Sequence, residues 1–162
     1  MSTAESHCAA APQGARVGGA VVTQAKLSVL LVHSPESSRK ALRAELELEA
    51  GVSVIGEADS HVSAMRMFFE HRPDVLVVGV CLQESSGFDV LVCVRQADSR
   101  CPLILLGDGQ DSFVEYVGRV YGATEVCCKD DNFHQVRGVL RRLAQARSAA
   151  ARNHELPRPE NS

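Results

Sequence analysis

Short apolar runs alternate with longer amphipathic segments along most of the chain. Five apolar runs have the length of β-strands and cover residues 27–32, 52–58, 74–80, 102–106 and 125–129. The segments that follow these runs repeat apolar residues at helical spacing. Strands that alternate with helices form parallel sheets with helices on both faces. The pattern therefore predicts an α/β fold built on a doubly wound, five-stranded parallel sheet.

Residues at the edges of these segments support the same division. Ser34, Ser60 and Asp111 each stand at the start of an amphipathic segment, and their side chains are typical helix N-caps. Gly122 follows the fourth amphipathic segment, as glycine often does at helix ends. The run at 74–80 is apolar at consecutive positions, which indicates a strand buried on both faces in the middle of the sheet.

The ends of the chain lack this pattern. Residues 1–25 are rich in Ala, Gly, Ser and Thr without a sustained period, so we expect a disordered N-terminal tail. One domain is expected over residues 26–145, because a chain of 162 residues suffices for one core of ordinary size. The last helix is expected to continue to about Ala151, and residues 146–162 to form a helix extension and a disordered tail.

Composition excludes several classes of function. Hydrophobic residues make up 45% of the chain and charged residues 23%, which is a soluble globular balance. The net charge of −3 argues against a nucleic-acid surface. No apolar run is long enough to cross a bilayer and no leader is evident, so the default location is cytoplasmic. The six cysteines show no Cys-x-x-Cys pair or zinc spacing. No cofactor or metal is therefore predicted.

Seven short segments carry a further signal through their order and spacing. They are Leu-Ser-Val-Leu-Leu-Val at 27–32, Val-Ile-Gly-Glu-Ala at 54–58, Arg-Pro-Asp-Val-Leu-Val-Val at 72–78, Ser-Gly-Phe-Asp-Val-Leu at 86–91, Pro-Leu-Ile-Leu-Leu at 102–106, Tyr-Gly-Ala at 121–123 and Cys-Lys-Asp at 128–130. Together they resemble the receiver domain of two-component response regulators over about residues 27–144. The expected fold is then CheY-like, with its strands in the order 2-1-3-4-5 when they are numbered along the chain.

The resemblance also implies a site at the carboxyl ends of the strands. The family uses an acidic pair, a phosphoacceptor aspartate, a hydroxyl, an aromatic ring and a lysine. The corresponding positions here are His33 and Ser34, Gly79, Gly107, Val126 and Lys129. Only Lys129 matches, glycine offers nothing to phosphorylate, and the absent carboxylates leave no evident Mg²⁺ ligands. We therefore predict a degenerate pseudo-receiver without a phosphoacceptor.

Such a domain is expected to act as a phosphorylation-independent protein–protein interaction module in signal transduction or transcription regulation, not as an enzyme. The resemblance implies contact with a protein partner or a second copy through the fourth helix, fifth strand and fifth helix. Arg141 and Arg142 lie on the polar side of the last helix, and arginine is favoured at interfaces. We therefore expect them to contact a partner, and to tolerate charge reversal without loss of folding.

An alternative function is a thiol- or ligand-sensing domain. Cys81 lies two residues after Gly79, so strand alternation directs both to the same side. His33 and Lys129 lie nearby in this fold, and neighbouring cations activate thiols. In the simplest interpretation Cys81 is inert and Lys129 pairs with Asp108, Glu84 or strand-end carbonyls. Asp108 and Asp111 are weaker candidates as substitute phosphoacceptors.

Overall fold

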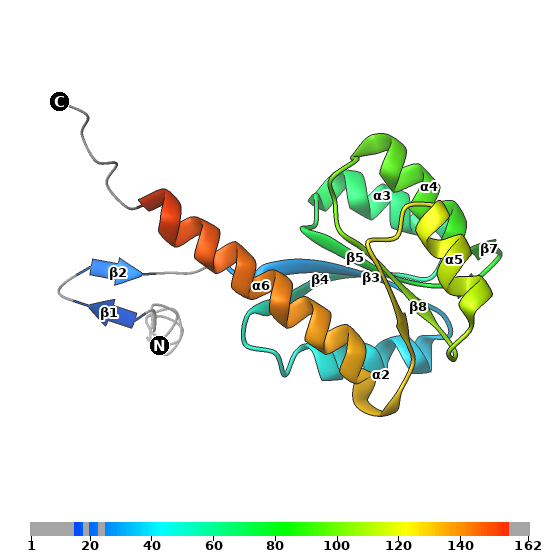
Figure 1. Ribbon diagram of the computed structural model, residues 1–162, viewed down its shortest axis with the longest axis horizontal. Helices are drawn as coiled ribbons and strands as arrows, with labels where there is room; N and C mark the ends of the chain where they lie inside the picture. The colour runs from blue at the N-terminus through cyan, green and yellow to red at the C-terminus, as the bar shows by residue number, and fades with distance from the viewer. Residues whose placement is uncertain (1–14, 18–19, 23–24, 156–162) are drawn as a thin grey trace, which may run out of the picture.

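The parallel sheet is present with the predicted strand order. The structure, a computed structural model, describes residues 15–17, 20–22 and 25–155 (Figure 1). The five strands are β3 (Leu27–Val32), β4 (Val52–Ala58), β5 (Val75–Gly79), β8 (Leu103–Gly107) and β9 (Glu125–Cys128). They run parallel in the order β4-β3-β5-β8-β9, which is 2-1-3-4-5 along the chain. The predicted fold class is confirmed.

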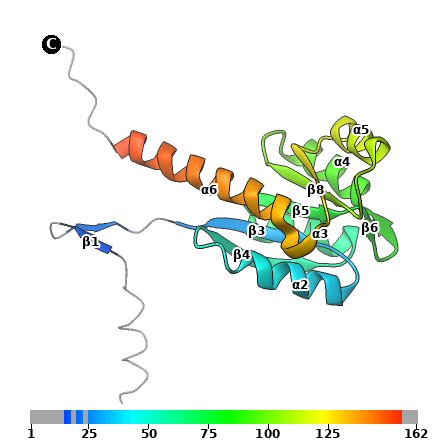
Figure 2. The same ribbon diagram turned by 60° about the horizontal axis from the view of Figure 1, so that its bottom comes forward.

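Helices cover both faces of this sheet. They are α2 (Glu36–Leu46), α3 (His61–His71), α4 (Gly87–Ala97), α5 (Ser112–Val120) and α6 (His134–Glu155), with a 3₁₀ turn at Asp131–Phe133 before α6. Helices α2 and α6 pack on one face, and α3, α4 and α5 lie on the other (Figure 1). The last turns of α6 extend beyond the sheet (Figures 1 and 2). Among the described residues, no helix is long and apolar enough to cross a membrane.

The central strand β5 joins the two halves of the core. All five of its residues are buried. Val75 and Val77 belong to the cluster beneath α2 and α6, whereas Leu76 and Val78 belong to the cluster beneath α3 and α4. Successive side chains of a strand point to opposite faces, so a strand covered on both sides must be apolar at every position.

Two of the predicted helix caps are confirmed and one is wrong. The Ser60 side chain accepts a hydrogen bond from the Ser63 backbone N–H in a capping box, and the Asp111 carboxylate accepts one from Phe113 N (2.9 Å). Ser34 does not cap α2, because Pro35 occupies the N-cap position and leaves Ser34 one residue outside the helix. The last helix also runs to Glu155, beyond the predicted end near Ala151.

Two short antiparallel pairs lie outside the five-stranded sheet. Strand β6 (Cys81–Leu82) pairs with β7 (Ser85–Ser86) in a segment predicted to be a loop. Strand β1 (Ala15–Val17) pairs with β2 (Ala20–Val22) inside the predicted N-terminal tail. The rest of that tail up to residue 24, and residues 156–162, lie outside the described residues, so the disorder of both ends stays a prediction.

Candidate functional site

The predicted site residues gather at one edge of the sheet. His33 and Ser34 follow β3, Gly79 and Gly107 are the last residues of β5 and β8, and Lys129 follows β9. Val32 is paired with Val78, and Gly79 with Leu106, so the ends of these strands are level. Residues that are far apart in sequence are thereby brought to the same edge.

The imidazole of His33 fills the space beside Gly79. The His33 residue is only 4% exposed. A Cβ atom added at residue 79 would overlap His33 Nδ1 and would lie 3.0 Å from Cε1. Because protein interiors are close-packed, a side chain at position 79 and the His33 ring compete for one volume. Glycine at position 79 is thus matched to histidine at position 33.

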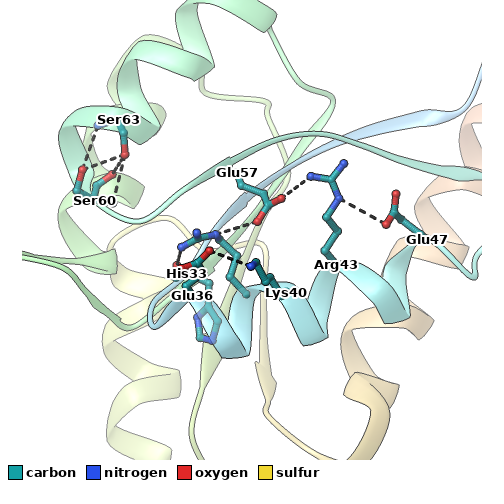
Figure 3. A network of polar contacts seen from close by, with 9 residues as sticks. His33, Glu36, Lys40, Arg43, Glu47, Glu57, Ser60 and Ser63 are labelled. Atoms are coloured by element: carbon teal, nitrogen blue, oxygen red, sulfur yellow. Dashed lines mark hydrogen bonds and ion pairs between the residues drawn. The ribbon is translucent and has the colours of Figure 1, made fainter.

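The backbone of His33 is held on both sides. Its N–H donates to the Ala58 carbonyl of β4 (3.0 Å), and its own carbonyl accepts from Arg39 Nη1 of α2 (3.0 Å). Arg39 Nε also donates to Glu57 Oε1 (2.9 Å), and Arg43 pairs with the same carboxylate (Figure 3). Two guanidinium groups of α2 therefore tie this helix to β4 and fix the strand end that carries His33.

The surroundings of His33 favour an uncharged ring. Burial, together with the positive charges of Lys129 and Arg39, lowers the pKa of His33 to about 4, and the negative charge of Asp108 opposes this shift. Both ring nitrogens are buried and have no hydrogen-bond partner in the part of the chain that the structure describes. The ring is therefore a neutral, space-filling group at neutral pH, and leaving its nitrogens unpaired costs about 1–3 kcal/mol.

Lys129 makes local contacts at this edge. Its Nζ lies 3.3 Å from Ser38 Oγ of α2 and 3.6 Å from the Asp108 carboxylate in the loop after β8. Its backbone N–H donates to the Gly107 carbonyl (2.8 Å). Of the alternative partners expected for Lys129, the structure shows the Asp108 carboxylate.

These residues do not fit a magnesium ion. Mg²⁺ is bound by oxygen ligands, usually one or two carboxylates. Positions 33, 34 and 79 supply an imidazole, a hydroxyl and no side chain. Among the side chains that the structure describes, no three from His, Cys, Asp or Glu are placed to hold a metal ion.

The other half of the edge is open. A pocket of about 520 Å³ lies between β8, α5 and β9, and its lining includes Gly107, Val126, Cys128 and Gln135. A Cβ atom at Gly107 would lie 3.6 Å from Val114 Cγ1, an ordinary contact distance. A side chain at position 107 therefore has room, unlike one at position 79.

Cys81 belongs to a different strand from Gly79, in a separate antiparallel pair. The parallel sheet ends at Gly79, and Cys81 belongs to β6, where it is paired with Ser86. Its side chain is exposed. Within the described residues it makes no hydrogen bond to His33 or Lys129, so its role as a reactive thiol stays a prediction.

The two arginines of α6 differ in their contacts. Arg141 donates from Nε and Nη2 to the carboxylate of Glu49 (2.9 and 3.0 Å), which also accepts from Arg137. The hydrogen bonds from Arg141 and Arg137 hold the pKa of the buried Glu49 below its usual range. Arg141 thus joins α6 to Glu49, and the expectation that its charge reversal leaves folding intact stays a prediction. The Arg142 side chain is more exposed, and its Nη2 lies 3.8 Å from Glu125 Oε1.

Sequence reasoning missed an apolar stripe on α5. Phe113, Tyr116 and Val120 are all exposed, by 70%, 69% and 64%. They share one side of the helix through their spacing of three and four residues. The sequence signal was this spacing, but such a stripe is read as a core face unless the packing of the helix is known.

Comparisons with known proteins agree with this fold. A transcriptional regulatory protein, AfsQ1 of Streptomyces coelicolor, is 32% identical over 119 residues, which make up 71% of this chain and 52% of that protein. The chain thus spans about half the length of the curated relatives it matches.

Solved structures show the same arrangement of strands and helices. One is a LuxR-family two-component response regulator from Aurantimonas, with a TM-score of 0.69 and 20% identity over 75% of this chain and 87% of that one. Another is the signal receiver domain of the putative response regulator NarL from Mycobacterium tuberculosis, with a TM-score of 0.68. The two are 22% identical, and the match covers 75% of this chain and 98% of that one. The model of the response regulator receiver domain matches residues 29–141. The chain therefore belongs to the response regulator receiver domain family.

Proposed function

We propose that this receiver domain is a pseudo-receiver that works without phosphorylation, as a protein-contact module in signal transduction. The observation that carries the proposal is the His33 ring in the volume that a side chain at position 79 would need. A neutral imidazole there replaces both the acceptor and a magnesium ligand. Fold and site are separable, so the domain can keep the fold after it has lost this chemistry.

The proposed contact surface consists of α5, β9 and α6, and we name it the α5–β9–α6 face. Its apolar part is the stripe of Phe113, Tyr116 and Val120 on α5. Large exposed apolar groups with polar neighbours mark interaction sites, and aromatic residues are enriched in interfaces. The stripe supports a contact that excludes water.

Charges on the same face support a second copy of this chain as the partner. Glu115 and Arg119 of α5, Glu125 of β9 and Arg142 of α6 carry both signs. Arg119 and Arg142 lie 3.9 and 3.8 Å from Glu125, in exposed pairs that are weak and can exchange partners. A two-fold interface presents one patch to itself and so requires a self-complementary surface. We therefore propose a homodimer through this face.

The phosphorylation part is tested with acetyl phosphate and Mg²⁺, and with a sensor kinase of two-component type, followed by mass spectrometry. We expect no acyl phosphate. A hydroxylamine-sensitive phosphoryl group on Asp108 or Asp111 would contradict the proposal. These two residues follow β8 closely and are the candidate substitute acceptors.

The contact part is tested by sedimentation over a concentration series with Tyr116→Asp. We expect self-association of the unaltered chain and its loss in the variant. Val62→Asp is the matched control, because Val62 is 77% exposed on α3, away from the proposed face. A chain that stays monomeric throughout, or equal loss of association in both variants, would contradict the homodimer.

A further inference from the structure

The described cysteines have different surroundings. Cys101 and Cys127 are buried, and burial raises the pKa of each thiol to about 11. Cys81 is exposed and Cys128 is half-buried. Cys93 is also half-buried, and its Sγ lies 3.1 Å from Nε2 of His61. Among the cysteines that the structure describes, Cys93 alone has an imidazole within hydrogen-bond distance.

Two anchored helices hold this pair together. His61 is the first residue of α3, where the Ser60 capping box fixes the helix start, and its backbone N–H donates to Ser85 Oγ (3.0 Å). Cys93 lies within α4, whose neighbouring Leu91 and Val94 are buried in the core. Helices α3 and α4 pack against each other (Figure 1). The separation of ring and thiol is therefore set by helix packing.

A thiol beside an imidazole is the arrangement of an activated nucleophile. The thiolate is the reactive form of cysteine, and an adjacent base within about 2.6–3.2 Å can take its proton. We propose that Cys93, with His61 as proton acceptor, is a site of thiol–disulfide exchange with low-molecular-weight disulfides. The modification goes beyond the proposed contact function and uses residues of the α3–α4 seam, none of which belongs to the α5–β9–α6 face.

The exchange step balances without a further reactant. The Cys93 thiol proton moves to His61 Nε2, and Cys93 Sγ attacks one sulfur of the reagent disulfide. The new bond joins Cys93 Sγ to that sulfur as the reagent S–S bond breaks. The second sulfur leaves as a thiolate and takes a proton back from the imidazolium. Cys93 is thereby oxidised to a mixed disulfide, and half of the reagent is reduced to a thiol.

The test uses the full chain and 2-hydroxyethyl disulfide, a neutral reagent that surface charge does not steer. Peptide mass spectrometry over time gives the rate at each cysteine. We expect Cys93 to react about tenfold faster than exposed Cys81, with Cys101 and Cys127 unreactive while the protein is folded. His61→Asn should lower the Cys93 rate to about that of Cys81 and leave the Cys81 rate unchanged.

Cys81 is the internal control because it is more exposed and lacks the imidazole. Far-ultraviolet circular dichroism and thermal unfolding confirm that the His61 variant is folded. A faster reaction at Cys81 than at Cys93 in the unaltered chain would overturn the proposal without any variant. An unchanged Cys93 rate in folded His61→Asn would overturn the role of the imidazole.

Discussion

The two halves of the candidate site differ in the space that they leave for a side chain. At the ends of β3 and β5, Gly79 has no room for a side chain because His33 occupies it. At the ends of β8 and β9, Gly107 borders a pocket of about 520 Å³ and has room for a side chain. Both positions carry glycine where the family has a functional side chain. The space beside Gly79 is filled by the His33 ring, whereas the space beside Gly107 is open. Departures from a family motif must therefore be judged by packing, one position at a time.

This difference also concerns charge. The filled half contains a neutral ring whose pKa is lowered to about 4, whereas the open half keeps Lys129 next to Asp108. Restoring one carboxylate at position 79 would therefore place it against His33. We therefore expect a carboxylate site at this edge to require changes at several positions together.

The largest expected effect is the pH dependence that the buried His33 ring gives to the free energy of unfolding. The folded-state pKa of His33 is about 4 against an ordinary value of 6.5. The unfolded chain thus binds more protons between these values, so the free energy of unfolding falls as the pH drops from about 6.5 toward 4. The full loss from this group is on the order of 3 kcal/mol. Urea denaturation between pH 6.5 and 4 measures this loss in the unaltered chain and in the variant His33→Gln, which lacks the imidazole. If the free energy of unfolding depended on pH equally in both proteins, the account would be contradicted.

A carboxylate at the filled half should weaken the fold and gain no metal. Gly79→Asp is expected to lower the free energy of unfolding by about 1–3 kcal/mol, because the new side chain overlaps the buried ring. Mg²⁺ titration by calorimetry should detect no tight binding, since His33 and Ser34 add no carboxylate. The variant that also carries His33→Asp and Ser34→Asp is the control that should bind Mg²⁺. Tight binding by the single variant would mean that other carboxylates complete the site.

The open half should tolerate the corresponding change. Gly107→Ser places a small side chain beside the pocket, where its Cβ makes ordinary contacts. We expect a change in the free energy of unfolding within about 0.5 kcal/mol, the range of substitutions that create neither overlap nor cavity. A loss as large as that of Gly79→Asp, in the same urea denaturation, would remove the distinction between the two halves.

Much of the fold was predictable because its signals are local. The apolar run of β5 and the capping residues Ser60 and Asp111 act on their own segments, and all three predictions are confirmed. The prediction for Ser34 failed because the helix starts one residue later, at a proline whose side chain cannot cap. Helix ends are set by backbone geometry that a residue pattern specifies only to within a residue or two.

The candidate site was predictable as a set of positions but not as an arrangement. The family resemblance marked His33 and Gly79 separately, and only the packing shows that one fills the space beside the other. The grouping of Cys81 with His33 assumed that the strand continues past Gly79, where the sheet in fact ends. The pairing of His61 with Cys93 depends on how two helices pack, which no local pattern encodes.

The central claim is that His33 occupies the volume that a side chain at position 79 would need. A double-mutant cycle tests it most directly, with urea denaturation of the unaltered chain, Gly79→Ala, His33→Ala and the double variant. We expect Gly79→Ala to lower the free energy of unfolding by about 1–3 kcal/mol in the unaltered chain and by much less after His33→Ala, because the smaller side chain leaves room for the added methyl group. An equal loss in both backgrounds would mean that the two residues do not compete for one volume, and would contradict the account.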